Sequence, residues 1–92
     1  MEKACARVIV SGLVQGVGYR FFAVRHGDAL ELTGYVRNVH DGTVEVEAEG
    51  NRDDLEKFIS RLREGPRAAR VTDVQVEWKE FKGRFAGFEV SF

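Results

Sequence analysis

The chain has 92 residues, of which 43% are hydrophobic and 32% are charged, a balance typical of a soluble globular domain. Its 14 basic and 15 acidic residues give a formal net charge of -1, so it lacks the basic excess of most nucleic-acid-binding proteins. We therefore expect a single domain over residues 1–92 with one hydrophobic core, and no nucleic acid as a partner.

The single cysteine and the N-terminal residues indicate where the protein works. Cys5 cannot form an internal disulfide, which suits a reducing compartment. The opening residues "MEKACARVIV" contain no apolar stretch long enough for a signal peptide or a membrane span. We expect a cytoplasmic, monomeric protein that does not bind membranes.

The first predicted elements are a strand and a helix. The segment "ARVIVSG" is rich in β-branched residues and predicts a strand. A helix is predicted from Tyr19 to about Leu32, because apolar and small side chains recur one turn apart on one side. These are Phe22, Ala23, His26, Gly27 and Leu30. The small side chains at Ala23 and Gly27 would let this helix lie close to a sheet.

A hairpin follows, in which "GYVRNV" and "TVEVEAE" flank "HDG". A two-residue turn would pair Val46 with Arg37, whereas a three-residue loop pairs Val46 with Val36 and Val44 with Asn38. Partners across a ladder share a face of the sheet, so the second register gathers the valines together and is favoured. It places Asn38 on the core-facing side, at the end of its strand.

The segment "NRDDLEKFISRL" is the clearest helix, with Asn51 as its expected N-cap. Its apolar stripe consists of Leu55, Phe58, Ile59 and Leu62. A loop around Gly65 and Pro66 separates it from two further strands. Their core-facing residues are predicted to be Val74, Val76 and Trp78 in "VTDVQVEW", and Phe88, Val90 and Phe92 in "GFEVSF".

The elements follow the order strand, helix, strand, strand, helix, strand and a short last strand. With right-handed crossovers, this order predicts an α+β fold, the ferredoxin-like (split βαβ) sandwich. Its sheet would be antiparallel with both helices on one face. We expect the other face to meet solvent, with Glu45, Glu47 and Glu49 exposed on it.

The glycine-rich segment "GLVQGVGYR", from Gly12 to Arg20, lies between the first strand and the first helix. Glycines there let backbone amides converge, and the first amides of a helix have no partner within it. Such a loop can bind phosphate, although a tight turn alone would use the same glycines. The segment fits neither a Walker A loop, which needs a lysine and a hydroxyl residue after the last glycine, nor the dinucleotide fingerprint.

Arg20 would lie in the first turn of the helix, where a cation opposes the macrodipole by about 0.3–1 kcal/mol. Its position is explained if an oxyanion is held by both the loop amides and the guanidinium group. The alternative is that Arg20 lies in solvent at the helix entrance, or pairs with Asp28 or Glu31.

Asn38 is the second candidate, because an amide side chain that faces the core side must find a partner. One interpretation is an Asx-type hydrogen bond into the turn "VHDG". Beside a phosphate site, the amide could instead accept from a water and donate to an oxyanion, which would place a nucleophile. The two interpretations are compatible.

The other reactive residue types favour structural roles. Cys5 lies too far from Arg20 to begin the loop of a cysteine phosphatase, His26 falls on the helix stripe, and His40 is a hairpin-loop residue. No cluster of histidine, cysteine or carboxylate residues has the spacing of a metal site. We expect no metal and no cofactor.

Two segments together are recognisable. "GLVQGVGYR" and "GYVRNVHDGTVE" closely resemble the two signature segments of the acylphosphatase family, in the same order and at the same separation. The resemblance covers nearly the whole chain, including "GPRAARV" and "GFEV". It implies metal-independent hydrolysis of small-molecule acyl phosphates to a carboxylate and inorganic phosphate.

By this resemblance Arg20 takes the place of the family's phosphate-binding arginine, and Asn38 that of the asparagine that positions the attacking water. The phosphate would be held by the backbone amides of Gln15, Gly16, Val17, Gly18, Tyr19 and Arg20. The chain departs from the family pattern at Glu31, where glycine commonly ends the first helix, and at Gly27, where alanine is common. A left-handed residue at position 31 would suit glycine better than glutamate.

Two other functions remain open. An RNA-binding module of the RRM type shares the predicted fold, and "KGRFAGFEV" superficially resembles one of its motifs, but at the last strand. Acylphosphatase-like domains also occur within larger carbamoyl-transfer maturation proteins, so the chain could serve such a protein.

Overall fold

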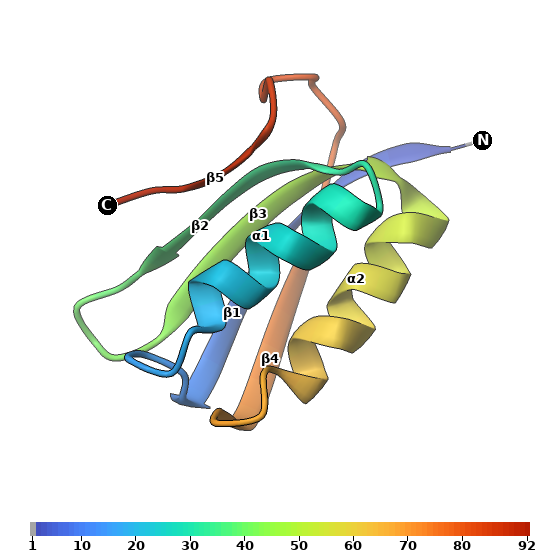
Figure 1. The fold of residues 1–92 in the computed structure, drawn as a ribbon. Helices are drawn as coiled ribbons and strands as arrows, with labels where there is room; N and C mark the ends of the chain where they lie inside the picture. The colour runs from blue at the N-terminus through green and yellow to red at the C-terminus, as the bar shows by residue number, and fades with distance from the viewer. Residues whose placement is uncertain (1) are drawn as a thin grey trace.

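The computed structural model describes residues 2–92, which form two layers, a five-stranded sheet and two helices on one of its faces (Figure 1). In chain order the elements are β1 (Lys3–Leu13), α1 (Tyr19–Ala29), β2 (Thr33–Asn38), β3 (Val44–Asn51), α2 (Arg52–Glu64), β4 (Arg70–Lys79) and β5 (Phe88–Val90). The strands lie in the order β4-β1-β3-β2-β5. This confirms the predicted ferredoxin-like sandwich. Within residues 2–92, no helix is long and apolar enough to cross a membrane.

The last strand makes the sheet a mixed one. β5 runs parallel to β2, from Phe88 opposite Gly34 to Val90 opposite Val36. The pairs β1–β3, β1–β4 and β2–β3 are antiparallel, as expected. The parallel pairing brings the end of the chain back along β2 (Figure 1), and so toward the strand that carries Asn38.

The core lies between the sheet and the helices. The sheet contributes Val8, Val10, Val36, Val44 and Val46, and the helices contribute Tyr19, Phe22, Ala23, Leu55, Phe58 and Leu62. Burying an apolar side chain of this size contributes about 1.5–3 kcal/mol relative to leaving it exposed. The shared core therefore fixes both helices, and the loop that precedes α1, against the sheet.

α1 lies as close to its neighbours as its small residues predict. Ala23 is fully buried, and a Cβ at Gly27 would lie 2.6 Å from a ring carbon of Phe88. No side chain fits at position 27 unless that ring moves, since core packing leaves little spare volume. Glycine at position 27, where the family commonly has alanine, is thus explained by the Phe88 ring of β5, which occupies the space of a Cβ.

The end of α1 confirms that position 31 is left-handed. Glu31 has a φ of 58° and is the only non-glycine residue with positive φ within residues 2–92. Leu32 N donates to Gly27 O at 2.9 Å and Glu31 N donates to Asp28 O at 3.0 Å, the pattern of a Schellman C-cap. A glutamate thus occupies a conformation that glycine adopts without steric cost.

α2 follows its predicted pattern, with Leu55, Phe58, Ile59 and Leu62 buried. Asp53 and Asp54 lie in its first turn, and Arg61 and Arg63 in its last, which suits the helix macrodipole. Asn51 is the N-cap residue as expected, but its side chain makes no capping hydrogen bond.

The hairpin register is also confirmed. Val36 pairs with Val46 and Asn38 with Val44, and the loop closes where Val39 N donates to Thr43 O at 2.9 Å. The core-facing valines thereby come together, as the favoured register requires.

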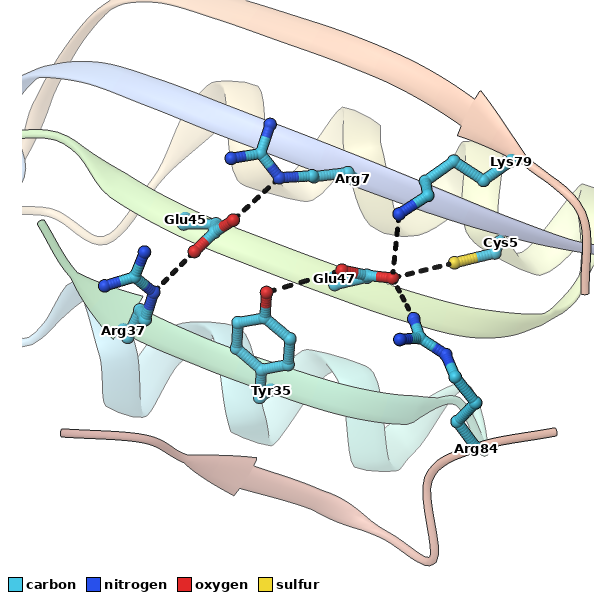
Figure 2. A network of polar contacts seen from close by, with 8 residues as sticks. All are labelled: Cys5, Arg7, Tyr35, Arg37, Glu45, Glu47, Lys79 and Arg84. Atoms are coloured by element: carbon cyan, nitrogen blue, oxygen red, sulfur yellow. Dashed lines mark hydrogen bonds and ion pairs between the residues drawn. The ribbon is translucent and has the colours of Figure 1, made fainter. Parts of the chain in front are cut away.

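The expectation of a solvent-exposed acidic face is wrong. Glu45, Glu47 and Glu49 lie on the side of β3 away from the helices, yet they are only 4%, 4% and 1% exposed. Basic side chains and a tyrosine lie against Glu45 and Glu47 (Figure 2). The segment 80–87 lies against Glu49. Buried carboxylates need such compensation, because their desolvation is costly when they are unpaired.

Glu45 lies between two arginines (Figure 2). Arg7 Nε donates to its Oε2 at 2.7 Å, and Arg37 Nε donates to its Oε1 at 2.5 Å. Burial raises the pKa of Glu45, but the hydrogen bonds from Arg37 and Arg7 outweigh burial and leave the pKa below its ordinary value. Glu45 is therefore charged in the folded protein at neutral pH.

Glu47 has a larger set of partners. Its Oε2 lies 3.5 Å from Lys79 Nζ, accepts from Cys5 Sγ at 3.5 Å and pairs with Arg84, while its Oε1 accepts from the Tyr35 hydroxyl at 3.3 Å. Burial raises the pKa of Glu47, but the bond from Cys5 and the charges of Arg84 and Lys79 lower it below its ordinary value. Burial, followed by Glu47, raises the pKa of the Cys5 thiol to about 11.

Glu49 anchors the segment 80–87 by its backbone. Lys82 N donates to Oε2 at 2.8 Å and Arg84 N donates to Oε1 at 3.0 Å. One carboxylate thus satisfies two amides of a segment that has no strand or helix of its own.

Two aromatic residues differ from the expected core. Phe88 is buried as predicted, but Phe92 is fully exposed, because it lies two residues beyond Val90, where β5 ends. Trp78 is 36% exposed, and the Arg52 guanidinium carbon lies 3.8 Å from its ring centroid. A cation over an indole face stabilises a ring that the core leaves partly uncovered.

Candidate active site

The loop from residue 14 to 18 joins β1 to α1. Gly16 and Gly18 have φ angles of 75° and 79°, in the left-handed region that favours glycine, and Gly18 is the N-cap residue of α1. These two glycines let the chain turn into the helix without steric strain. The loop lies next to the turn between β2 and β3 (Figure 1).

The backbone amides of residues 15 to 20 form an unpaired group. Within residues 2–92 they donate to no backbone or side-chain oxygen, and the first amide donation at this helix start is from Phe22 N to Gly18 O at 3.0 Å. Unpaired amides at a helix N-terminus favour an anion, because the positive end of the macrodipole lies there too.

Arg20 adds a cation to these amides. It is half-buried, the first turn of α1 contains no acidic residue, and within residues 2–92 neither Asp28 nor Glu31 forms an ion pair with it. Its guanidinium carbon lies 5.5 Å from the ring centroid of Phe92. The predicted alternative of an ion pair within the helix is therefore wrong, and the guanidinium group is available to a ligand.

Asn38 ends β2 on the core-facing side. Its Oδ1 is buried and has no hydrogen-bond partner within residues 2–92. The alternative Asx-type bond is made by a different residue, since Asp41 Oδ1 accepts from Thr43 N at 3.0 Å and from Thr43 Oγ1 at 2.7 Å. A buried acceptor without a partner is costly, and such an atom is a candidate for a functional contact.

One cavity of about 310 Å³ brings the candidates together. Gly16, Gly18, Arg20 and Asn38 all line it. The remaining lining residues are Val14, Tyr19, Phe21, Val90 and Phe92. The cavity thus combines loop glycines, one cation and one amide side chain with apolar walls, and its lining residues include no aspartate or glutamate.

Two of the predicted phosphate-binding residues do not line this cavity. Val17 packs against the core, and Gln15 turns its side chain to the hairpin, where Nε2 donates to Val39 O and Thr43 O. For these two residues only the backbone amides can take the predicted role. The Tyr19 side chain lines the cavity, but its hydroxyl donates to Leu62 O at 2.6 Å and is not free to bind a phosphate. Burial of the Tyr19 ring raises the pKa of its hydroxyl.

Sequence reasoning missed part of the cavity wall. Phe21 is 74% exposed and follows Arg20 directly, so it lies off the core stripe of α1. Its absence from that stripe could have marked it as a site residue. Phe92 could not be found in this way, because its position in "GFEVSF" continues the core-facing alternation of β5.

The remaining reactive residues have structural surroundings. The His26 ring lies 4.4 Å from the Phe22 ring, and burial, then the charges of Arg25 and Arg61, lowers its pKa. Within residues 2–92 no group of three or more histidine, cysteine or acidic side chains could hold a metal ion. A larger groove of about 420 Å³ between α2 and β4 contains Arg52 but none of the predicted site residues.

Comparison with known proteins places this geometry in a family. The family model described as Acylphosphatase matches residues 6–90. An acylphosphatase of Pelotomaculum thermopropionicum is 47% identical over the full length of both chains. The crystal structure of acylphosphatase from Bacillus subtilis superposes with a TM-score of 0.94 at 35% identity, covering 97% of this chain and 99% of that one.

A second kind of structure also shares the fold. Full-length HypF in the phosphate- and nucleotide-bound form gives a TM-score of 0.87 at 26% identity, and the match covers 99% of this chain but 12% of that one. By its fold and cavity the chain is a small α+β sandwich protein with a glycine loop of unpaired backbone amides between β1 and α1. The family match is more specific: the chain belongs to the acylphosphatase family.

Proposed function

We propose that this protein hydrolyses acyl phosphates to a carboxylate and inorganic phosphate. The observation that carries the proposal is the cavity shared by the glycine loop, Arg20 and Asn38, in which the buried Asn38 Oδ1 has no partner within residues 2–92. Family membership supports the same reaction.

In the proposed mechanism the phosphoryl oxygens bind the amides of residues 15 to 20 and the guanidinium group of Arg20. Asn38 Oδ1 accepts a hydrogen bond from a water molecule and holds it for attack on phosphorus. The water oxygen forms a bond to phosphorus while the bond from phosphorus to the acyl oxygen breaks, and the carboxylate leaves with the electron pair. The water protons pass to phosphate oxygens and solvent.

This chemistry needs little beyond positioning and charge. An acyl phosphate is a mixed anhydride with a good leaving group, so neither a covalent intermediate nor a strong general base is required. Donors placed around the transferred group stabilise the charge that spreads over its oxygens. We accordingly propose that hydrolysis needs no metal, and that a chelator leaves the rate unchanged.

The test measures benzoyl phosphate hydrolysis by purified wild type, Arg20→Ala and Asn38→Ala, with folding checked by circular dichroism. Arg20→Ala should lower kcat/KM by about 10²–10³-fold, because it removes a donor to the charged oxygens. Asn38→Ala should lower kcat by up to about 10²-fold with little change in KM, because it removes only the placement of water.

Matched controls are Arg25→Ala, an exposed arginine of the same helix, and Asn51→Ala, whose side chain makes no cap bond. Both should retain wild-type kinetics. A folded Arg20→Ala with full activity contradicts the mechanism. Absence of hydrolysis in the wild type, with a salt-dependent shift on single-stranded RNA, would favour an RNA-binding module instead.

A further inference from the structure

Gln15 is the residue through which the loop contacts the hairpin. Its Nε2 donates to Val39 O at 2.8 Å and to Thr43 O at 2.9 Å. Val39 directly follows β2 and Thr43 directly precedes β3, and the two residues close the hairpin through their own hydrogen bond. A single amide group therefore binds both ends of the turn, next to the last residue of β2 and the first residue of β3.

No other contact of this kind joins the two segments. Within residues 2–92, these are the only hydrogen bonds between the loop of residues 14–18 and the hairpin of residues 38–43. On the other edge of β2, the pairing with β5 reaches Val36, whose carbonyl also accepts from Ser91 N at 2.8 Å. Beyond Val36, the end of β2 that carries Asn38 is held by its pairing with β3 and, one residue further on, by the hydrogen bond from Gln15 to Val39 O.

The two groups of the cavity meet through this side chain. Gly16, which lines the cavity, follows Gln15 in the chain, and Asn38 directly precedes Val39. The path from the loop to the residue next to Asn38 consists of the Gln15 side chain and one hydrogen bond, to Val39 O. A shift of either segment would change the distance between the phosphoryl group and the water.

We propose that the Gln15 side chain is a positioning residue, which fixes Asn38 relative to the loop so that the water lies in line with the acyl leaving group. This inference rests on the proposed acyl phosphate hydrolysis. The Nε2 group of Gln15 is not free to bind the substrate, since both of its hydrogens are used by the hairpin carbonyls. A misplacement of about 1 Å can cost up to about 10²-fold in rate, so the effect is measurable.

The experiment compares Gln15→Met, which keeps the length of the side chain but has no donor, with wild type and with Gln75→Met. Gln75 is an exposed glutamine of β4, distant from the cavity residues in the sheet order. With benzoyl phosphate, Gln15→Met should lose about 10- to 100-fold in kcat. KM and the inhibition constant of inorganic phosphate should change less than about threefold, because the loop amides and Arg20 remain.

A second variant and a double variant separate positioning from a structural role. Gln15→Glu directs carboxylate oxygens at two carbonyl oxygens and should lose more in kcat than Gln15→Met does. In the Asn38→Ala background, Gln15→Met should cost little further activity, because both changes remove the same placement of water. If Gln15 only stabilised the fold, Gln15→Met would lower the denaturation midpoint, but its effect on kcat would not depend on whether Asn38 is present.

The outcomes are distinct. Suppose that wild type and Gln75→Met hydrolyse benzoyl phosphate and that Gln15→Met stays within twofold of them in kcat. The proposal that Gln15 positions Asn38 is then overturned, and the proposed hydrolase function is unaffected. Losses that simply multiply in the double variant also overturn the positioning proposal, since Gln15 and Asn38 would then act independently. If neither wild type nor Gln75→Met hydrolyses the substrate, the proposed function itself fails.

Discussion

Three residues that flank or end α1 share a left-handed backbone, and only one of them is not glycine. Gly16 and Gly18 lie before the helix, and Glu31 lies after it. For the two glycines the conformation has no steric cost, whereas for glutamate it brings Cβ close to a carbonyl oxygen. The two glycines before the helix therefore line the cavity without steric strain, while Glu31 after it lowers the stability of the protein.

Glu31→Gly should raise the free energy of unfolding by about 0.5–1 kcal/mol. Relief of the left-handed conformation is worth roughly 1–2 kcal/mol, and the greater freedom of glycine in the unfolded chain offsets about 0.5–1 kcal/mol. Urea denaturation measures the change. Lys57→Gly, on the exposed face of α2, is the control and should lower the free energy of unfolding by about 1 kcal/mol. A less stable Glu31→Gly protein would show that the glutamate side chain has a stabilising contact.

At the scale of the elements, β3 is buried on both faces from Val44 to Glu49. The alternation of valine and glutamate predicted its register and its core face correctly, because side chains alternate between the two faces of a sheet. It could not predict the cover over the glutamates. That cover comes from Arg7 on β1 and from residues near position 84, which are distant in sequence and have no periodicity of their own.

Glu49→Gln should weaken the attachment of the segment 80–87 and lower the free energy of unfolding by about 1.5–3 kcal/mol, as for hydrogen bonds to a charged group. Glutamine has one acceptor oxygen, so only one of the amides of Lys82 and Arg84 keeps its bond. Urea denaturation again provides the measurement, with faster amide hydrogen exchange at positions 82 and 84 as a local readout. Glu77→Gln, on exposed β4, is the control and should change stability by less than about 0.5 kcal/mol. Equal effects of the two variants would argue against the anchoring role of Glu49.

For the whole molecule, the buried carboxylates of Glu45 and Glu47 and the partly buried His26 make stability depend on pH on the acidic side. The folded pKa values of Glu45 and Glu47 lie below 4.5, and that of His26 lies below 6.5. A group with a depressed pKa stabilises the fold fully above its unfolded pKa, and this contribution disappears as the pH falls through the folded pKa. Stability is therefore greatest near neutral pH and decreases in two stages on acidification.

The urea midpoint should decrease slightly below about pH 6.5 as His26 becomes protonated in the unfolded state, and more steeply below about pH 4.5 as the glutamates do. Denaturation curves between pH 3 and pH 8 test this expectation. Glu45→Gln should be less stable at neutral pH and should show a shallower decrease below about pH 4.5, with the upper stage unchanged. A midpoint that stays constant down to pH 3 would contradict the charged state of the buried glutamates.

The parts of the candidate site that depend on residue type and neighbouring sequence were predictable, and the contacts between segments distant in sequence were not. Arg20, the loop glycines and Asn38 were found from residue type and register, and one cavity brings them together. The contact between the Gln15 side chain and the hairpin was missed, because it depends on two carbonyl groups of a hairpin whose distance from the loop no sequence pattern encodes. Phe92 was assigned to the core because the alternation continues past the residue where the strand ends.

The buried thiol of Cys5, beneath the basic side chains, can report on local opening of the protein. Cys5 is 1% exposed, donates to Glu47 and has a pKa of about 11, so in the native state it is neither accessible to a thiol reagent nor ionised at neutral pH. A reagent can modify it only during the intervals in which the cover of the acidic face has lifted. Because it is the only cysteine in the chain, its alkylation rate measures how often that cover opens, in the unaltered protein and without any added label.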